Sequence, residues 1–147
     1  MKFKISLLLA LVFLTGTSSA IAQNDSFLCV ADKSVGFSFN KSTKEWESTN
    51  FKAEGKYVLS KPSDKAKGWE LKEFGSSITD KCAGGFSENG FIYCKGWKDF
   101  QMNNKSLRFQ IVSAAGYVIS EYLDLDDGQH AEGSVTPYLE IGKCSPL

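Results

Sequence analysis

Apolar residues occur along most of the chain in short runs with a spacing of two, which is the period of a β-strand that buries one face. Breaks rich in Gly, Asn, Ser and Lys separate these runs at intervals of about ten residues. The runs lie at residues 27–31, 37–39, 57–59, 69–74, 91–94, 109–113 and 138–141. The pattern predicts an all-β fold, either a small antiparallel barrel or a sandwich of about 7–9 strands.

Three stretches carry signals for hairpin turns. Asn89-Gly90, directly before the run 91–94, is the dipeptide that most favours a two-residue hairpin loop, because both residues accept a positive φ. Residues 36–46 (GFSFNKSTKEW) and 100–109 (FQMNNKSLRF) both place an Asn-Lys-Ser triplet between apolar or aromatic positions. Because Asn and Ser side chains bond nearby backbone groups, we expect two hairpins with polar tips of about four or five residues.

Aromatic side chains are the candidates for contact with a ligand or partner: Phe37, Phe39, Trp46, Trp69 and Trp97. Phe37 and Phe39 share one face of their strand, because alternate side chains of a strand point the same way. The competing interpretation is that these rings fill the core, since aromatic side chains supply the most buried area per residue in a small domain. The sequence favours core filling for most of them and does not identify the exceptions.

Residues 1–22 have the three-part pattern of a secretory signal peptide. Two lysines precede an uncharged, mostly apolar run at residues 5–16, and Ala20 and Ala22 supply the small side chains before the cleavage site. The run is shorter than the roughly 20 residues that a membrane-spanning helix needs. We therefore expect cleavage before Gln23.

Cleavage would leave residues 23–147, which is the length of a single domain. The removed segment holds two lysines and no acidic residue, so the mature chain has 15 basic and 17 acidic residues and a formal charge of −2. A nearly neutral domain lacks the electrostatic footprint of a nucleic-acid-binding protein, and no basic run is present for an anionic membrane. We expect a secreted or periplasmic protein that binds no nucleic acid and inserts stably in no membrane.

The four cysteines, Cys29, Cys82, Cys94 and Cys144, all lie in the mature part. An even number of cysteines in an exported chain predicts two disulfides. Zinc binding is the alternative, but the spacings match no zinc pattern and His130 is the only histidine. We therefore expect an oxidised domain without a metal.

Three connectivities are open to four cysteines, and the positions favour one of them. Cys82 and Cys94 flank the predicted Asn-Gly turn, and a hairpin brings residues at similar distances from its turn side by side. Cys29 and Cys144 lie near the two ends of the mature chain, and chain ends often approach each other in single domains. We therefore expect the pairs Cys29–Cys144 and Cys82–Cys94.

The segment 124–127 (DLDD) forms the acidic cluster of a polar stretch at residues 120–136, which we expect to be a surface loop. Calcium binds loops that supply several carboxylates. The helix–loop–helix calcium pattern fails here, because Gly128 comes one position early and Val135 stands where the closing Glu belongs. We expect a solvated acidic turn, with calcium binding left open.

No constellation predicts catalysis. His130 has no recognisable triad partner, and no Gly-x-Ser-x-Gly motif is present. Paired carboxylates can hydrolyse sugars, but the candidates lie on strands where alternation predicts a solvent-facing side chain; they are Glu45, Glu47, Glu70 and Glu73. We expect no catalytic residue, no metal ligand and no cofactor.

Several segments carry a resemblance to other proteins: FSFNKSTKEW, LRFQIV, Gly116-Tyr117 and PYLEIGKC at residues 137–144. They resemble a group of small exported bacterial proteins, two-disulfide β domains of unassigned function. A weaker likeness, in size, export and strand content, is to periplasmic inhibitors of lysozyme, which are small disulfide-linked β-barrels. Residues 113–117 carry no loop motif of those inhibitors, so no residue's role is carried over.

These features together predict an exported, non-enzymatic binding or inhibitor-type β domain of the cell envelope. Its partner would be an unidentified protein or a small apolar ligand. Two alternatives stay open: a hydrolase acting on cell-envelope material, and a structural component of an envelope assembly. A barrel cavity lined by Phe and Trp would favour a small ligand, a cleft with two facing carboxylates would favour hydrolysis, and an exposed aromatic patch would favour a protein partner.

Overall fold

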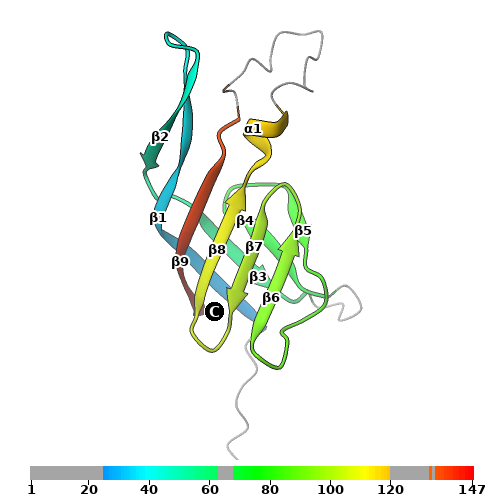
Figure 1. The fold of residues 1–147 in the computed structure, drawn as a ribbon. Coiled ribbons are helices and arrows are strands. Elements are labelled where there is room, and N and C mark those ends of the chain that lie inside the picture. Colours follow the sequence, from blue (N-terminus) through cyan, green and yellow to red (C-terminus); the bar gives the residue numbers. More distant parts are fainter. Residues whose placement is uncertain (1–24, 63–67, 120–132, 134) are drawn as a thin grey trace, which may run out of the picture.

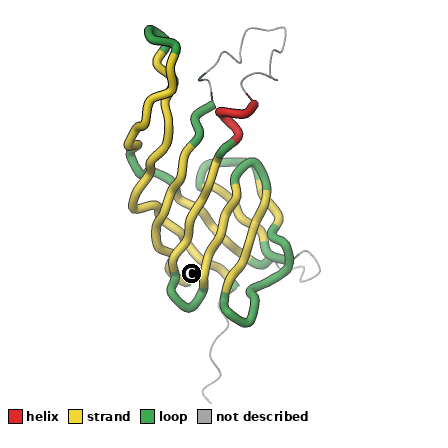
Figure 2. The backbone as a smooth tube through the Cα atoms, in the orientation of Figure 1, coloured by secondary structure: helices red, strands yellow, loops and turns green. Residues whose placement is uncertain are grey.

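The computed structural model describes residues 25–62, 68–119, 133 and 135–147. This part of the chain is nearly all antiparallel β-sheet, as predicted, with one helix of five residues (Figures 1 and 2). Its elements are β1 (Ser26–Asn40), β2 (Glu45–Phe51), β3 (Lys56–Ser60), β4 (Glu70–Glu73), β5 (Thr79–Lys81), β6 (Phe91–Lys95), β7 (Asp99–Asn103), β8 (Arg108–Ser113), α1 (Ala115–Ile119) and β9 (Tyr138–Pro146). The predicted signal peptide, the acidic segment 124–127 and His130 lie outside the described residues.

The strands form a nearly closed barrel rather than a sandwich. Their order is β5-β4-β3-β1-β9-β8-β7-β6, so the last strand, β9, returns to pair with β1. The two strands at the ends of this order, β5 and β6, are joined by a β-bridge between Cys82 and Cys94. β2 lies outside the barrel and pairs with β1 alone among the described strands.

β1 belongs both to the barrel wall and to a hairpin outside the barrel. Its first residues pair with β3 and β9 in the barrel wall, whereas residues 34–40 pair with β2 in a hairpin that extends past the barrel (Figure 1). We call this hairpin, residues 34–51, the arm. The register against β9 shifts between Ala31 and Lys33. Both Ala31 and Ser34 are buried, so the shift is a bulge that resets the alternation and turns Val35 and Phe37 to the outer surface.

Apolar side chains fill the barrel interior, which eight strands make just wide enough for side chains. Trp69 is 4% exposed and packs against Phe27 and Phe86, with ring centroids 6.1 Å and 5.0 Å away. Trp69, one of the aromatic candidates for contact with a ligand or partner, therefore has its ring in the core. The buried apolar residues are Phe27, Cys29, Ala31, Tyr57, Leu59, Trp69, Leu71, Ile92, Cys94, Phe100, Met102, Phe109, Ile111 and Cys144.

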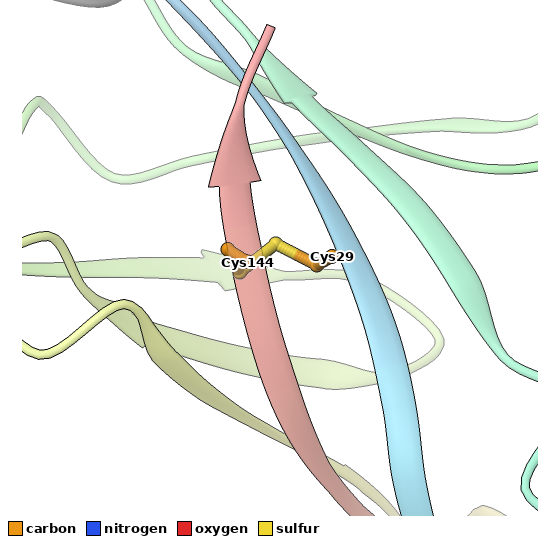
Figure 3. Close-up of a disulfide and its surroundings, with 2 residues drawn as sticks. All are labelled: Cys29 and Cys144. Atoms are coloured by element: carbon orange, nitrogen blue, oxygen red, sulfur yellow. A yellow bond between two sulfur atoms is a disulfide. The ribbon is translucent and has the colours of Figure 1, made fainter.

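Both predicted disulfides are present. Cys29 and Cys144 lie directly opposite each other in the register of β1 and β9, and their bond crosses between these strands (Figure 3). The bond between Cys82 and Cys94 joins the β5 and β6 sides of the remaining seam. Two disulfides indicate an oxidising compartment outside the cytoplasm.

The two predicted polar hairpins have the same turn. The side-chain oxygen of Asn40 accepts hydrogen bonds from the backbone N–H groups of residues 42 and 43, and that of Asn103 accepts them from residues 105 and 106. In each turn the fourth residue after the Asn has a positive φ, 61° at Lys44 and 55° at Leu107. Asn40 therefore corresponds to Asn103, not to Asn104 of the second Asn-Lys-Ser triplet.

The Asn89-Gly90 turn differs from the prediction. Only Gly90 has a positive φ, of 85°, and its N–H donates to the backbone oxygen of Ser87. The turn ends a loop between β5 and β6 instead of forming a two-residue hairpin. Gly84, in the same loop, also has a positive φ, of 77°, which a glycine adopts without strain.

Candidate functional site

Polar side chains line the upper end of the barrel, the end that carries α1 and the arm in Figure 1. Glu140 on β9 is 6% exposed, and Tyr57 on β3 is buried beside it. The Tyr57 hydroxyl donates a hydrogen bond of 2.7 Å to Oε2 of Glu140. A carboxylate inside a barrel needs such a donor, because burying an unpaired charge costs several kcal/mol.

Gly55 makes room for this pair. A Cβ atom at Gly55 would overlap the Glu140 carboxylate and the Tyr57 hydroxyl group. The backbone oxygen of Gly55 also accepts a 2.9 Å hydrogen bond from the N–H of Ala31, next to the β1 bulge. The connection before β3 is thereby held against the inner carboxylate, and only glycine fits there.

Lys98 and Glu73 form an ion pair next to this hydrogen bond. Their charged atoms lie 2.7 Å apart, and the Lys98 ammonium lies 5.8 Å and 5.7 Å from the ring centroids of Tyr57 and Tyr138. The chain places Lys98 there because it follows the turn between β6 and β7 at the same end of the barrel. The result is a connected layer of five polar residues: Tyr57, Glu73, Lys98, Tyr138 and Glu140.

Two residues of this polar layer, Tyr57 and Lys98, have pKa values raised above their ordinary values. Burial raises the pKa of the Tyr57 hydroxyl, and its hydrogen bond to Glu140 raises the pKa further. Burial lowers the pKa of Lys98, but hydrogen bonding to Glu73 and Tyr138 raises it by more. Tyr57 therefore stays a donor and Lys98 stays charged at neutral pH, which suits a fixed structural layer better than a proton-transfer site.

Exposed apolar side chains surround this end. Trp97 is 71% exposed, and Phe74 and Ile78 on the neighbouring turn are exposed as well. We call these three residues the rim. A shallow hollow of about 460 Å³ lies beside Trp97 and Ile78, and a smaller pocket of about 90 Å³ leads down to Tyr57 and Lys98.

The arm carries the other aromatic candidates. Phe39 and Trp46 are cross-strand neighbours with ring centroids 5.5 Å apart, and Tyr117 of α1 packs edge-on against Trp46 at 5.8 Å. A Cβ atom at Gly133 would overlap the Phe39 ring, so the chain before β9 rests on this ring. These contacts brace the arm against the barrel.

The predicted aromatic candidates therefore separate into three groups. Phe37 and Trp97 are exposed, Phe39 and Trp46 are half-buried in the arm, and Trp69 is in the core. The structure does not bring Phe37 and Trp97 together with the rest into one site.

Sequence reasoning missed the inner polar layer. Glu73 was expected on a solvent-facing side, yet it follows Leu71 on the inner face of β4 and bonds Lys98. Glu140 could have been found, because alternation places it on the same strand face as Cys144, and cysteine is among the residues most often buried.

Neither a metal site nor a membrane-spanning helix is found in the described part. No group of three or more His, Cys, Asp or Glu residues there is arranged to hold a metal ion. No helix of this part is long and apolar enough to cross a membrane. The acidic segment 124–127, for which calcium binding was left open, lies outside the described ranges.

The likeness to small exported bacterial proteins and to periplasmic lysozyme inhibitors stays a prediction. No protein-family model, curated protein or solved structure matches this chain.

Proposed function

We propose that the protein is an exported, non-enzymatic binding domain of the cell envelope that contacts a protein partner through the rim. The observation that carries this proposal is the exposure of Trp97 beside the hollow that it shares with Ile78. Tryptophan residues at the centre of an interface often contribute about 2 kcal/mol or more to binding. A large exposed ring next to a hollow offers both an anchor and a place for a partner's side chain.

A small apolar ligand inside the barrel is the weaker of the two expected partners. The interior described here is occupied by core side chains such as Phe100 and Met102, which are 1% exposed. The pocket that leads inward from the rim is about 90 Å³, below the roughly 300–1,000 Å³ of sites that enclose a small molecule. The rim instead resembles the surface of a protein-binding domain.

Hydrolysis is not the function that this geometry favours. Glu73 and Glu140 both point into the upper end, but Lys98 and Tyr57 already hold their carboxylates by hydrogen bonds. A hydrolytic pair needs one free acid and one free base or nucleophile around a bound substrate. The polar layer is better explained as a structural network of hydrogen bonds that holds together the strands at the upper end of the barrel, beneath the rim.

Export to the periplasm or beyond is part of the proposal. The two disulfides support it, because they form and persist in oxidising compartments. The basic start, the apolar run and the small residues before Gln23 support it from the sequence.

The test is site-specific capture. Wild-type residues 23–147 and the variant Trp97→Ala are immobilised, exposed to envelope extract of the producing cells, and the retained proteins are quantified by mass spectrometry. We expect one partner to be retained by wild type and reduced at least tenfold by Trp97→Ala. Phe37→Ala is the matched control, because Phe37 is an exposed ring on the arm, outside the rim. Equal capture by wild type and Trp97→Ala would refute the rim as the binding surface.

A further inference from the structure

An open groove of about 580 Å³ crosses the outer face of β6, β7, β8 and β9, the four strands at the front of the barrel in Figure 1. This volume is within the roughly 300–1,000 Å³ of ligand sites. The groove is separate from the rim, and it combines rings, amides and charges. The residues that line it include Asp32, Phe91, Gln101, Arg108, Gln110, Ile141 and Lys143.

The strand register arranges these side chains in rows. Directly paired residues of neighbouring strands point to the same face, so a continuous set of pairs marks a line across the sheet. One row is Phe91, Asn103, Arg108 and Lys143, and the adjacent row is Tyr93, Gln101, Gln110 and Ile141. With strands about 4.8 Å apart, each row spans roughly 14 Å.

Two aromatic rings, which we call the ring platform, lie at one end of the groove: Phe91 in its lining and Tyr93 beside it on the same face of β6. Phe91 and Tyr93 are 43% and 44% exposed, and their rings lie nearly parallel, at an interplanar angle of 24° with centroids 6.4 Å apart. Two flat rings with a common orientation suit a flat ligand with C–H groups on its face. Sugar rings have such a face, with hydroxyl groups around the edge.

The middle of the groove offers a donor and an acceptor side by side. Gln110 donates from Nε2 to Oε1 of Gln101 at 3.3 Å, and both side chains are half-buried. This bond leaves the amide N–H groups of Gln101 and the amide oxygen of Gln110 for a ligand. A hydroxyl group both donates and accepts, so it can bond the two amides together.

The other end carries two adjacent positive charges. Arg108 on β8 lies directly opposite Lys143 on β9, and both side chains are exposed. Like charges directly opposite each other destabilise a sheet. Neither side chain forms an ion pair within the described ranges, where the ion pairs are Lys52–Glu54 and Lys98–Glu73. Asp32 is the acidic residue of the same lining, so the groove carries two positive charges and one negative charge. A bound carboxylate would relieve the repulsion between the two cations, and a guanidinium group such as that of Arg108 can hold it through two parallel hydrogen bonds.

We propose that this groove binds an acidic oligosaccharide, with a sugar ring on Phe91 and Tyr93, a hydroxyl group on the paired glutamines and a carboxylate on Arg108 and Lys143. The ring platform and the amides select the sugar, and the two cations select its charge. An added peptide strand would need an open sheet edge, whereas this groove lies on the face of strands already paired on both sides, except β6. A polynucleotide is bound mainly through many contacts between cations and its phosphates, whereas this groove offers two cations for one carboxylate.

The test uses an oligogalacturonate hexamer and its fully methyl-esterified form, which keeps the sugar backbone and removes the charges. Binding to wild-type residues 23–147 is measured by titration calorimetry. We expect the acid to bind and its ester to bind at least tenfold more weakly. The double variant R108Q/K143Q should lose at least tenfold in affinity for the acid, and Phe91→Ser should lose a similar factor. Both variants change exposed side chains, and an unchanged melting temperature verifies that they fold.

Trp97→Ala is the control variant and should bind the hexamer like wild type, which separates this groove from the rim. Polyglutamate of matched charge tests whether charge alone is recognised. Equal binding of polyglutamate would overturn the proposal in favour of an acidic peptide. Absence of hexamer binding at millimolar concentration, or binding unaffected by R108Q/K143Q, would also overturn it. None of these outcomes depends on whether a protein partner contacts the rim.

Discussion

Cys29 and Cys144 lie directly opposite each other on β1 and β9, so their disulfide joins the first strand of the barrel to the last. The two strands are also paired by backbone hydrogen bonds along residues 27–36 of β1. The other seam, between β5 and β6, has a single β-bridge, and the disulfide Cys82–Cys94 lies at that bridge. The two disulfides therefore close seams of very different strength.

Removing the two disulfides should have different effects. The pair Cys29→Ser/Cys144→Ser opens a closed loop with a sequence separation of 115, which the chain-entropy model values at about 5 kcal/mol. Cys82→Ser/Cys94→Ser opens a separation of 12, valued at about 3 kcal/mol, but it removes the main link across the weak seam. We expect the first variant to lose more global stability in urea unfolding. We expect the second to show faster amide exchange in β5 and β6.

Ser42→Ala is the control for both disulfide variants, because Ser42 is exposed at the tip of the arm and its side chain makes no hydrogen bond among the described residues. Its unfolding midpoint should match that of wild type. A Cys29→Ser/Cys144→Ser variant as stable as Ser42→Ala would contradict the assignment of this bond as the main covalent constraint.

Tyr57→Phe should destabilise the barrel by about 1–3 kcal/mol, because it leaves the buried Glu140 carboxylate without its donor. Urea unfolding at neutral pH measures this loss. Tyr93→Phe is the matched control, since the Tyr93 ring is exposed on β6. Equal effects of the two substitutions would show that the inner hydrogen bond contributes little.

The difference in stability between wild type and Tyr57→Phe also depends on pH. The pKa of Tyr57 is raised in the folded state above its ordinary value of 10.0, so the unfolded chain releases this proton first as the pH rises. The stabilisation is therefore complete below pH 10 and is lost above it, at up to about 1.4 kcal/mol per pH unit. Between pH 10 and 11, wild type should lose stability faster than Tyr57→Phe. Parallel curves for the two proteins would contradict the raised pKa.

Asn40→Ala and Asn103→Ala remove the same turn interactions from two different places. Asn103 holds the turn between β7 and β8 in the barrel wall, so its loss should lower global stability by about 1 kcal/mol. Asn40 holds the tip of the arm outside the barrel, so its loss should speed amide exchange near residues 40–46 and leave the melting temperature unchanged. An equal fall in melting temperature would mean that the arm and the barrel unfold together.

Gly55→Ala should cost about 1–3 kcal/mol, because the new methyl group would overlap the Glu140 carboxylate and the Tyr57 hydroxyl. Gly85→Ala is the control: the nearest atom to its new methyl group would be Nε1 of Trp69 at 3.7 Å, an ordinary contact. Thermal unfolding compares the two. The interpretation of Gly55 as a required gap fails if both variants melt at the same temperature.

The period-two pattern and the cysteine positions were enough to predict most of the strands, though not β5, together with the antiparallel barrel as one of two forms and both disulfides. These features depend on local spacing or on the nearness of chain ends, which a sequence displays directly. The Asn40 and Asn103 turns were predictable for the same reason, since each is built from a side chain bonding its own backbone two and three residues later.

The features that sequence reasoning missed depend on long-range register. The bulge between Ala31 and Lys33 leaves no local signal, yet it decides which face of β1 the later residues share. The buried carboxylate of Glu140 violates the rule that strand carboxylates face solvent, whereas the Glu73 side chain is 42% exposed at the end of β4. Their partners, Tyr57 and Lys98, come from other strands and turns. The groove on β6 to β9 combines residues of four strands, so it exists only once their register is known.

The double role of β1 has a mechanical consequence. A force applied to the tip of the arm is transmitted along one continuous strand into the barrel wall, where the disulfide between Cys29 and Cys144 passes it to the final strand. Rupture of backbone hydrogen bonds alone cannot release β1 from β9, because the covalent bond holds them at that point. The arm is therefore covalently anchored to the last strand of the barrel. A force on the arm is carried by the Cys29–Cys144 disulfide, which thermal motion does not break.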